Sequence, residues 1–262
     1  AEGVLRSYSP PWQPQLLRGV GRIEADGALT ELPWVRAGNR IFVDCPLVEG
    51  EALRLRIRAG GELIEPEGQT AIRPLAGWSW YPRPPGPDRH RFELVASVPR
   101  FWDLAATGRR VEESDDGRTR TIISREERPV LQGGAFLVDA RAVPGPPTRP
   151  GQPVIRVLRN PATVELTARG VPAQIQRHLA DLEALIGAFP YEELEVIERG
   201  AGTNGWASVP GVVALARFDS PPGQVITTRV GSATLLSALG RQSLGVDLGP
   251  ASEHDAWLLE GL

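Results

Sequence analysis

Short segments in the first half of the chain alternate apolar and polar residues, the period of a half-buried strand. Leu53, Leu55 and Ile57 alternate with arginines, and Gly60-Gly61 follows, which predicts a hairpin turn into a return strand at 62–64. Further strands are expected at 92–98, 120–124 and 135–138, with a turn at 115–117. This density of strands and turns predicts an antiparallel β-sandwich over residues 1–143.

The pattern changes after a proline-rich segment. Residues 144–153 hold too many prolines for regular structure and are predicted to be a linker. Beyond them, apolar residues at helical spacing predict helices at 171–189 and 232–244, and a third from 253 to the end. Short apolar runs predict strands at 154–158, 194–197 and 212–216. Residues 154–262 are therefore expected to form a mixed α/β domain.

Composition excludes several classes of chemistry. The 262 residues contain no Lys, one Cys and three His, with 29 basic residues that are all Arg. A lysine Schiff base, a P-loop lysine, an internal disulfide and a cysteine metal cluster are thus excluded. The net charge of -3 predicts no nucleic-acid partner. No apolar run approaches the ~20 residues of a membrane-spanning helix, so no span is expected in this chain.

Several motifs favour ordinary structural interpretations. Residues 200–205 match G-x-G-x-x-G, but Pro210 and Gly211 follow too soon for the helix that dinucleotide binding requires, so a glycine-rich loop is expected. The histidines at 90, 178 and 254 lack metal-ligand spacing. No G-x-S-x-G motif is present. The aromatic residues around 78–81 could form a carbohydrate or peptide platform, although packing within a β domain is more typical.

Several segments resemble one family. Residues 78–82 (WSWYP), 92–99 (FELVASVP) and 105–108 (AATG) resemble the N-terminal β domain of aminopeptidase N-like gluzincin zinc metallopeptidases. Residues 154–157, 189–196 and 257–261 resemble segments of that family's catalytic domain. The resemblance implies a β + α/β fold class: an N-terminal antiparallel β-sandwich followed by a partial thermolysin-like α/β domain.

The family's zinc motif is H-E-x-x-H, followed after eighteen residues by Glu. With Glu260 as the third ligand, Ser237 and Arg241 stand at the two histidine positions and Ala238 at the general-base position. Gln242 matches the residue that follows the second histidine in the family. Zinc is the family's cofactor, but the resemblance implies no metal, no cofactor and no catalytic residue here. Arg241 and Glu260 are hypothesised to form an ion pair across the former site.

A second family signature, G-A-M-E-N, holds the substrate amino terminus through its Glu. Residues Gly205, Trp206, Ala207 and Ser208 match its start, with Ser208 at the Glu position, and are the expected substrate-binding residues. The resemblance therefore implies a non-catalytic, peptidase-like module that binds or scaffolds a peptide or protein. An enzyme is not favoured.

Other interpretations remain open. One is an active hydrolase with a rearranged site built from His254, Asp255 and Glu260, or with a site completed by a partner chain that supplies the rest of the catalytic domain. Another is an interaction protein in which the β-sandwich binds the partner. Residue 1 is Ala, which predicts a processed or trimmed product. An extracytoplasmic or membrane-tethered location is favoured.

Overall fold

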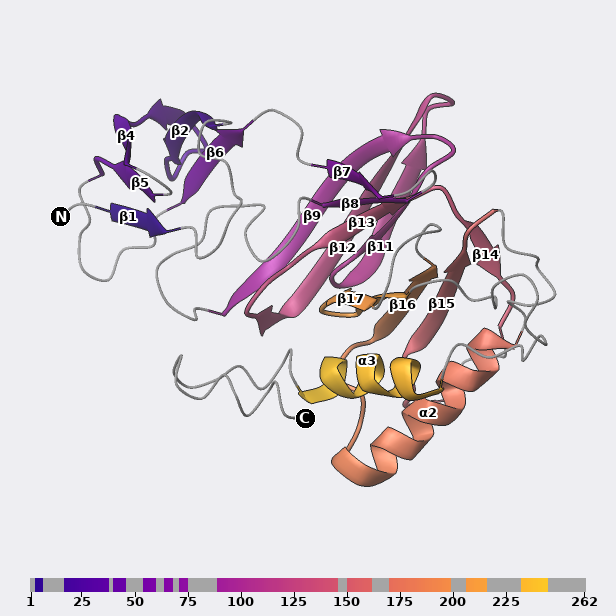
Figure 1. Ribbon diagram of the computed structural model, residues 1–262. Coiled ribbons are helices and arrows are strands. Elements are labelled where there is room, and N and C mark those ends of the chain that lie inside the picture. Colours follow the sequence, from indigo (N-terminus) through magenta and orange to yellow (C-terminus); the bar gives the residue numbers. More distant parts are fainter. Residues whose placement is uncertain are drawn as a thin grey trace. The chain divides into compact units, whose positions relative to one another are not determined.

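The computed structural model describes strands and two helices in the residue ranges given next. The described residues are 3–6, 17–37, 40–45, 54–59, 64–67, 71–74, 89–145, 150–161, 170–198, 206–215 and 232–244. Packing divides the chain into two compact units (Figure 1). The first comprises Ala1–Glu65 and Pro74–Asp88, and the second comprises Pro66–Arg73 and Arg89–Leu262.

The first unit holds two three-stranded antiparallel sheets. Their strands are β1 (Gly3–Arg6), β5 (Arg40–Val43) and β4 (Trp34–Ala37), then β3 (Leu29–Glu31), β2 (Leu17–Ile23) and β6 (Leu55–Ala59). The strand predicted from the alternation at 53–57 is confirmed as β6. The predicted hairpin from β6 into a return strand is wrong, because β6 pairs with β2. That pairing sets Ile57 opposite Val20, and both contribute to one apolar cluster.

Two antiparallel sheets in the second unit confirm the strands expected at 92–98, 120–124 and 135–138. One sheet has the order β11 (Arg109–Asp115), β12 (Thr119–Val130), β9 (His90–Pro99). The other has the order β10 (Asp103–Ala106), β13 (Ala135–Val138), β8 (Ala71–Pro74), β7 (Ile64–Glu67). The predicted turn at 115–117 joins β11 to β12, and the Asp116 carboxylate accepts the backbone N–H groups of Arg118 and Thr119.

The third sheet of this unit is five-stranded and mixed. Its order is β14 (Arg141–Val143), β15 (Val154–Arg159), β16 (Glu193–Glu198), β18 (Val212–Leu215), β17 (Trp206–Val209). The three central strands are parallel, and each outer strand is antiparallel to its neighbour. Helices α2 (Val171–Ile186) and α3 (Ser232–Leu244) confirm the two predicted helices. The third predicted helix, from residue 253, lies outside the described residues.

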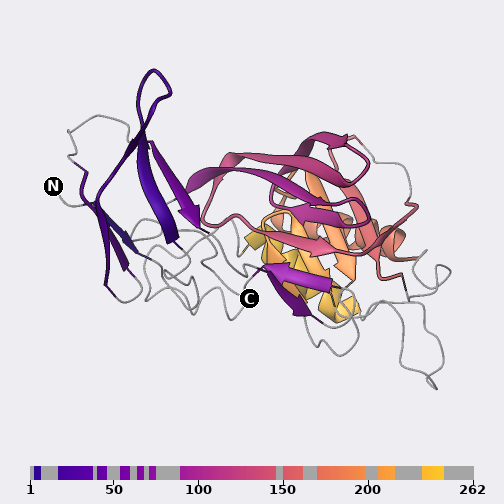
Figure 2. The same ribbon diagram turned by 90° about the horizontal axis from the view of Figure 1, so that it is seen from above.

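The layers of this unit follow from the buried faces of β13. Phe136 and Val138 pack against the five-stranded sheet, whereas Ala135 and Leu137 pack against β9 and β12. A strand that is buried on both faces has a continuous apolar sequence, and residues 135–138 of β13 are all apolar. The other face of the five-stranded sheet is covered by α2 and α3 (Figure 1). Figure 2 shows the magenta strands β9–β13 beside the orange sheet.

These layers bear on the predicted domains. Residues 89–143 share one compact unit with residues 154–262, and the described packing separates the chain within residues 65–89 instead. The division into 1–143, 144–153 and 154–262 stays a prediction. Residues 144–145 and 150–153 contain no helix or strand, in agreement with their proline content. Among the described residues, no helix is long and apolar enough to cross a membrane.

Candidate functional site

Helix α3 carries three of the four residues matched to the zinc motif. Ser237 and Arg241 are exposed, whereas Ala238 is completely buried in the apolar cluster between the helices and the sheet. Where the motif has a general-base carboxylate, this helix therefore packs a methyl group into the core. Glu260 lies outside the described residues, so its predicted ion pair with Arg241 stays a prediction.

The packing of the two helices shows where α3 lies on the sheet. Helix α2 packs on β15, and α3 packs on β17 and β18, so α3 is the helix nearer the β17 edge. Gly240 faces α2, because a Cβ built there would lie 3.9 Å from Cδ2 of Leu182. Ser237 and Arg241 lie one helical turn apart, and both are on the exposed side of α3. The helix that carries them packs on the edge strand β17.

Strand β17 carries the residues matched to the second signature. Trp206, Ala207 and Ser208 lie on it, and Gly205 lies outside the described residues. It pairs with β18 through a two-residue turn, Pro210-Gly211, in which Gly211 has a φ of 78°. This value suits the glycine position of a type II turn. The sequence predicted a loop here and missed the strand.

The open edge of β17 presents backbone groups. In a hairpin with a two-residue turn, the pair next to the turn exchanges hydrogen bonds and the following pair does not. Val209 and Val212 form the first pair, and Ser208 and Val213 form the second. The backbone N–H and C=O of Ser208 therefore point away from β18. Within the described residues, β17 is the last strand of its sheet.

Gln242 fastens this hairpin to α3. Its Nε2 donates to the carbonyl oxygens of Val209 at 2.8 Å and Val212 at 2.9 Å, and its Oε1 accepts the N–H of Gly211 at 3.1 Å. The side chain is completely buried. The sequence matched Gln242 to the family register but gave it no role. The structure shows that it holds the β17–β18 hairpin and α3 together.

A ring of charged side chains, with Glu195 buried and the others partly buried, lies on the other face of the sheet. Arg156 Nη1 is 2.5 Å from Glu195 Oε1, and Arg156 also contacts Asp103. Arg110 Nη2 lies 2.8 Å from Asp103 Oδ1 and 3.8 Å from Glu195 Oε1, which closes the ring. Glu195 Oε2 also accepts the N–H of Ala106 at 3.0 Å. The ring therefore joins β10 and β11 to β15 and β16.

The two carboxyl groups of the ring respond differently to their surroundings. Burial raises the pKa of Glu195 to about 7, against the attraction of Arg156 and Arg110 and with help from the charge of Glu193. Burial also opposes ionisation of Asp103, but Arg156 and Arg110 together hold its pKa below the usual value. Sequence alone contained no signal for this ring, because its members are far apart along the chain.

Glu195→Gln should change how stability depends on pH. Between pH 4.5, the ordinary pKa of a glutamate, and about 7, Glu195 stays protonated in the folded chain but ionises on unfolding. Its raised pKa therefore contributes stability below this window that is lost as pH rises through it, by roughly 3 kcal/mol in total. The measurement is the free energy of unfolding of this unit at several pH values, from denaturant-dependent hydrogen exchange. In Glu195→Gln, the free energy of unfolding should no longer fall between pH 4.5 and about 7 on account of this group. The same pH dependence in the variant as in wild type would contradict the raised pKa of Glu195.

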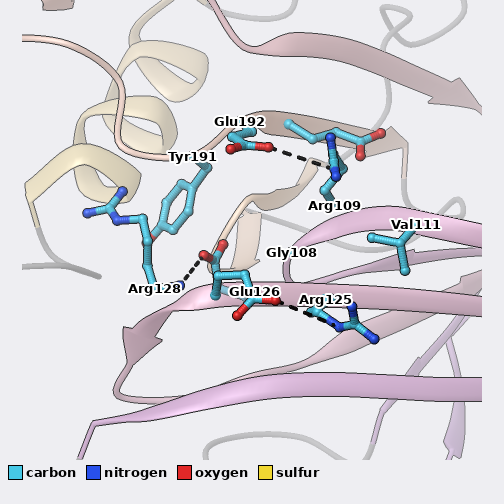
Figure 3. Close-up of a pocket in the computed structure, with 10 residues that line it drawn as sticks. Gly108, Arg109, Val111, Arg125, Glu126, Arg128, Tyr191 and Glu192 are labelled. Atoms are coloured by element: carbon cyan, nitrogen blue, oxygen red, sulfur yellow. Dashed lines mark hydrogen bonds and ion pairs between the residues drawn. The ribbon is translucent and has the colours of Figure 1, made fainter.

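A small cavity of about 170 Å³ lies between the β10–β11 turn, the second half of β12 and residues 191–193 (Figure 3). The Arg128 guanidinium lies over the Tyr191 ring, 5.7 Å from its centroid. Arg109 lies 3.8 Å from Glu192, and Arg125 lies 2.5 Å from Glu93. Because arginines and glutamates both line this cavity and pair with one another, its charge favours neither an anion nor a cation.

The remaining candidate residues do not form a metal centre in the part of the chain that the structure describes. No group of three His, Cys, Asp or Glu side chains among those residues could hold a metal ion. His90 lies on β9 and His178 on α2, where His178 Nδ1 is 3.8 Å from Asp181. His254 and Asp255, which belong to the alternative rearranged site, lie outside the described residues.

Comparison with known proteins identifies the fold. No family model and no curated protein matches the sequence. An M1 zinc metallopeptidase from Deinococcus radiodurans matches with a TM-score of 0.73 and 21% identity, over 99% of this chain and 60% of that one. The fold is that of M1 zinc metallopeptidases. A mutant of that metallopeptidase bound to a Tyr-Ser-Ala substrate, and a two-domain mutant bound to L-arginine, each match with a TM-score of 0.70.

The M1 fold agrees with the resemblance deduced from the sequence motifs. The chain spans about 60% of the length of these solved structures. It consists mostly of strands, with two described helices. Ser237 and Arg241 lie one turn apart on α3, and α3 packs on the strand that carries Ser208. The structure thus brings together the two motifs that the sequence matched separately.

Proposed function

We propose that this chain is a non-catalytic, peptidase-like module that binds an extended segment of a peptide or protein along β17. The observation that carries the proposal is the open edge of β17 among the described residues, beside the helix that carries Ser237 and Arg241. An extended peptide can add to such an edge through main-chain hydrogen bonds. The outward N–H and C=O of Ser208 are the groups that would bind it.

Three residues of α3 also support the absence of hydrolysis. Zinc peptidases of this type need two imidazoles one helical turn apart and a carboxylate that takes a proton from the attacking water. Ser237 supplies a hydroxyl, Ala238 supplies a buried methyl group and Arg241 supplies a permanent positive charge. A cation would be repelled by that guanidinium. These residues can hold a segment but cannot activate water through a metal.

The proposal predicts that one backbone N–H controls binding. Ser208→Pro removes the outward N–H while leaving the β17–β18 hydrogen bonds in place, because those come from neighbouring residues. Ser208→Ala keeps the N–H and is the matched control. The measurement is retention of a pool of random heptapeptides on the immobilised chain, with mass spectrometry of the retained and recovered peptides.

The wild-type chain and Ser208→Ala should retain peptides and return them uncleaved, whereas Ser208→Pro should lose most of the retention. Equal retention by the proline variant would show that β17 is not the binding edge. Cleaved peptides would show that the chain is an active hydrolase, as the alternative interpretation holds.

A further inference from the structure

Strand β6 of the first unit carries a row of arginines on one face. Arg54 immediately precedes the strand, and Arg56 and Arg58 lie within it, alternating with Leu55 and Ile57. Leu55 and Ile57 pack against the apolar cluster of this unit, so the three arginines lie on the opposite face, where all are exposed. The Cα atoms of successive arginines are about 6.7 Å apart along an extended strand.

The neighbouring strand β2 leaves this face of the sheet flat. Gly21 lies opposite Arg56, and Gly19 lies opposite Arg58. The Arg58 guanidinium lies over Gly19, because a Cβ built there would be 3.2 Å from its Nη2. Leu29 of β3 covers Gly21 in the same way, with its Cδ1 at 2.8 Å from a built Cβ. No side chain of β2 therefore stands beside Arg56.

The carboxylates near this face leave two of the arginines without a counter-ion. Glu31 Oε1 lies 3.0 Å from Arg58 Nη2, and both side chains are exposed. Glu24 pairs with another arginine, at the end of β2, over 3.3 Å. Within the described ranges, no carboxylate lies within ion-pair distance of Arg54 or Arg56. The face thus presents unmatched positive charge.

Strand β6 also presents backbone groups at an open edge. It is the last strand of its sheet in the part of the chain that the structure describes. Ile23 donates its N–H to the carbonyl oxygen of Arg54 at 2.9 Å, so these two residues form a hydrogen-bonded pair. Along an antiparallel ladder such pairs alternate with non-bonded ones. The N–H and C=O groups of Leu55 and Ile57 therefore point away from β2, to the open edge.

We propose that β6 binds an extended acidic segment of a partner protein, whose acidic residues stand at alternate positions. Such a segment adds to the sheet as an antiparallel strand and exchanges hydrogen bonds with Leu55 and Ile57. Its residues opposite Arg54 and Arg56 then form the non-bonded pairs, in which side chains lie closer together. Because both strands have the same rise, carboxylates two residues apart match successive arginines. This surface belongs to the first unit and is separate from the binding edge proposed at β17.

Four labelled heptapeptides, acetylated and amidated, test this proposal by fluorescence anisotropy with the full chain. The alternating peptide is TVEVEVT, and the second has glutamine in place of both glutamates. The third, TVEEVVT, has the same composition but adjacent glutamates, and the fourth is the alternating peptide with its central valine N-methylated.

The alternating peptide should bind roughly tenfold more tightly than its glutamine counterpart, as two cross-strand pairs of opposite charge allow. The adjacent-glutamate peptide should bind roughly threefold more weakly than the alternating one, because only one carboxylate faces the arginines. The N-methylated peptide should lose most of the binding, because its central residue no longer donates a hydrogen bond to the edge of β6.

Two arginine variants assign the preference to this face. Arg56→Gln should reduce the preference for glutamate over glutamine roughly threefold, because one cross-strand pair is lost. Arg36→Gln is the matched control, since it removes the same charge from β4, in the other sheet of this unit, and should keep the full preference. Arg36 and Arg56 are both exposed, so neither change should disturb the core.

Equal binding of the alternating and adjacent-glutamate peptides would show a face that attracts acidic polymers in general, and would overturn the proposal. Undiminished binding of the N-methylated peptide would do the same, because it would show that no strand is added. The proposal is also wrong if Arg56→Gln keeps the full preference, or if none of the four peptides binds.

Discussion

Arg110→Met is expected to lower the free energy of unfolding of the second unit by about 3–5 kcal/mol. Arg110 joins two carboxylates of the ring, and its side chain is only 16% exposed. Its guanidinium also donates to the carbonyl oxygen of Leu104 at 2.6 Å. Without it, Asp103 keeps Arg156 as its only guanidinium in the ring, and part of its negative charge is uncompensated.

The control is a second arginine of the same unit. Arg125 lies 2.5 Å from Glu93, but both side chains are 47% exposed. Arg125→Met should therefore cost much less than Arg110→Met, because exposed ion pairs contribute little to stability. Hydrogen exchange of the segments 103–113 and 193–198 in increasing urea measures the unfolding of this unit directly. Similar losses for both variants would contradict a stabilising role of the ring.

Gln242→Leu is expected to lower the same free energy by about 2–4 kcal/mol and to loosen β17. Leucine fills similar space but leaves the buried N–H of Gly211 without the Gln242 acceptor, at a cost of about 1–3 kcal/mol. The carbonyl oxygens of Val209 and Val212 lose one donor each. Because β17 is the proposed binding edge, peptide retention should fall together with stability.

Gln176→Leu on α2 is the matched substitution. Gln176 is half-buried and donates one hydrogen bond of 3.3 Å to Gln152, so its loss should cost less than about 1 kcal/mol. Faster exchange of the Gly211 amide in Gln242→Leu alone would locate the effect in the hairpin. A Gly211 amide as protected in Gln242→Leu as in wild type would show that Gln242 does not hold β17.

Periodicity predicted the elements whose burial is local in the sequence. Helix α3 begins and ends at the residues expected, and β13 coincides with the apolar run 135–138. The sequence did not predict strand β17, because residues 206–211 follow a glycine-rich segment and resemble its continuation. The sequence also did not predict the pairing of β6 with β2. The glycine pair that follows β6 favoured a local hairpin over pairing with a distant strand.

The candidate site was predictable only in part. Counting back along the sequence from Glu260 identified the zinc-motif positions on α3, because the residues of that motif have a fixed spacing. That α3 lies beside β17 follows only from the packing of α2 and α3 on the sheet, which no local pattern encodes. The charge ring lay beyond sequence reasoning for the same reason: Asp103, Arg110, Arg156 and Glu195 meet only through the stacking of sheets.

Zinc content tests the central claim most directly. The purified chain is dialysed against excess zinc, then against buffer, and the bound metal is measured by mass spectrometry. A chain with Ser237, Ala238 and Arg241 on α3 should retain no stoichiometric zinc. One zinc ion retained per chain would contradict the non-catalytic function proposed for this M1-like fold.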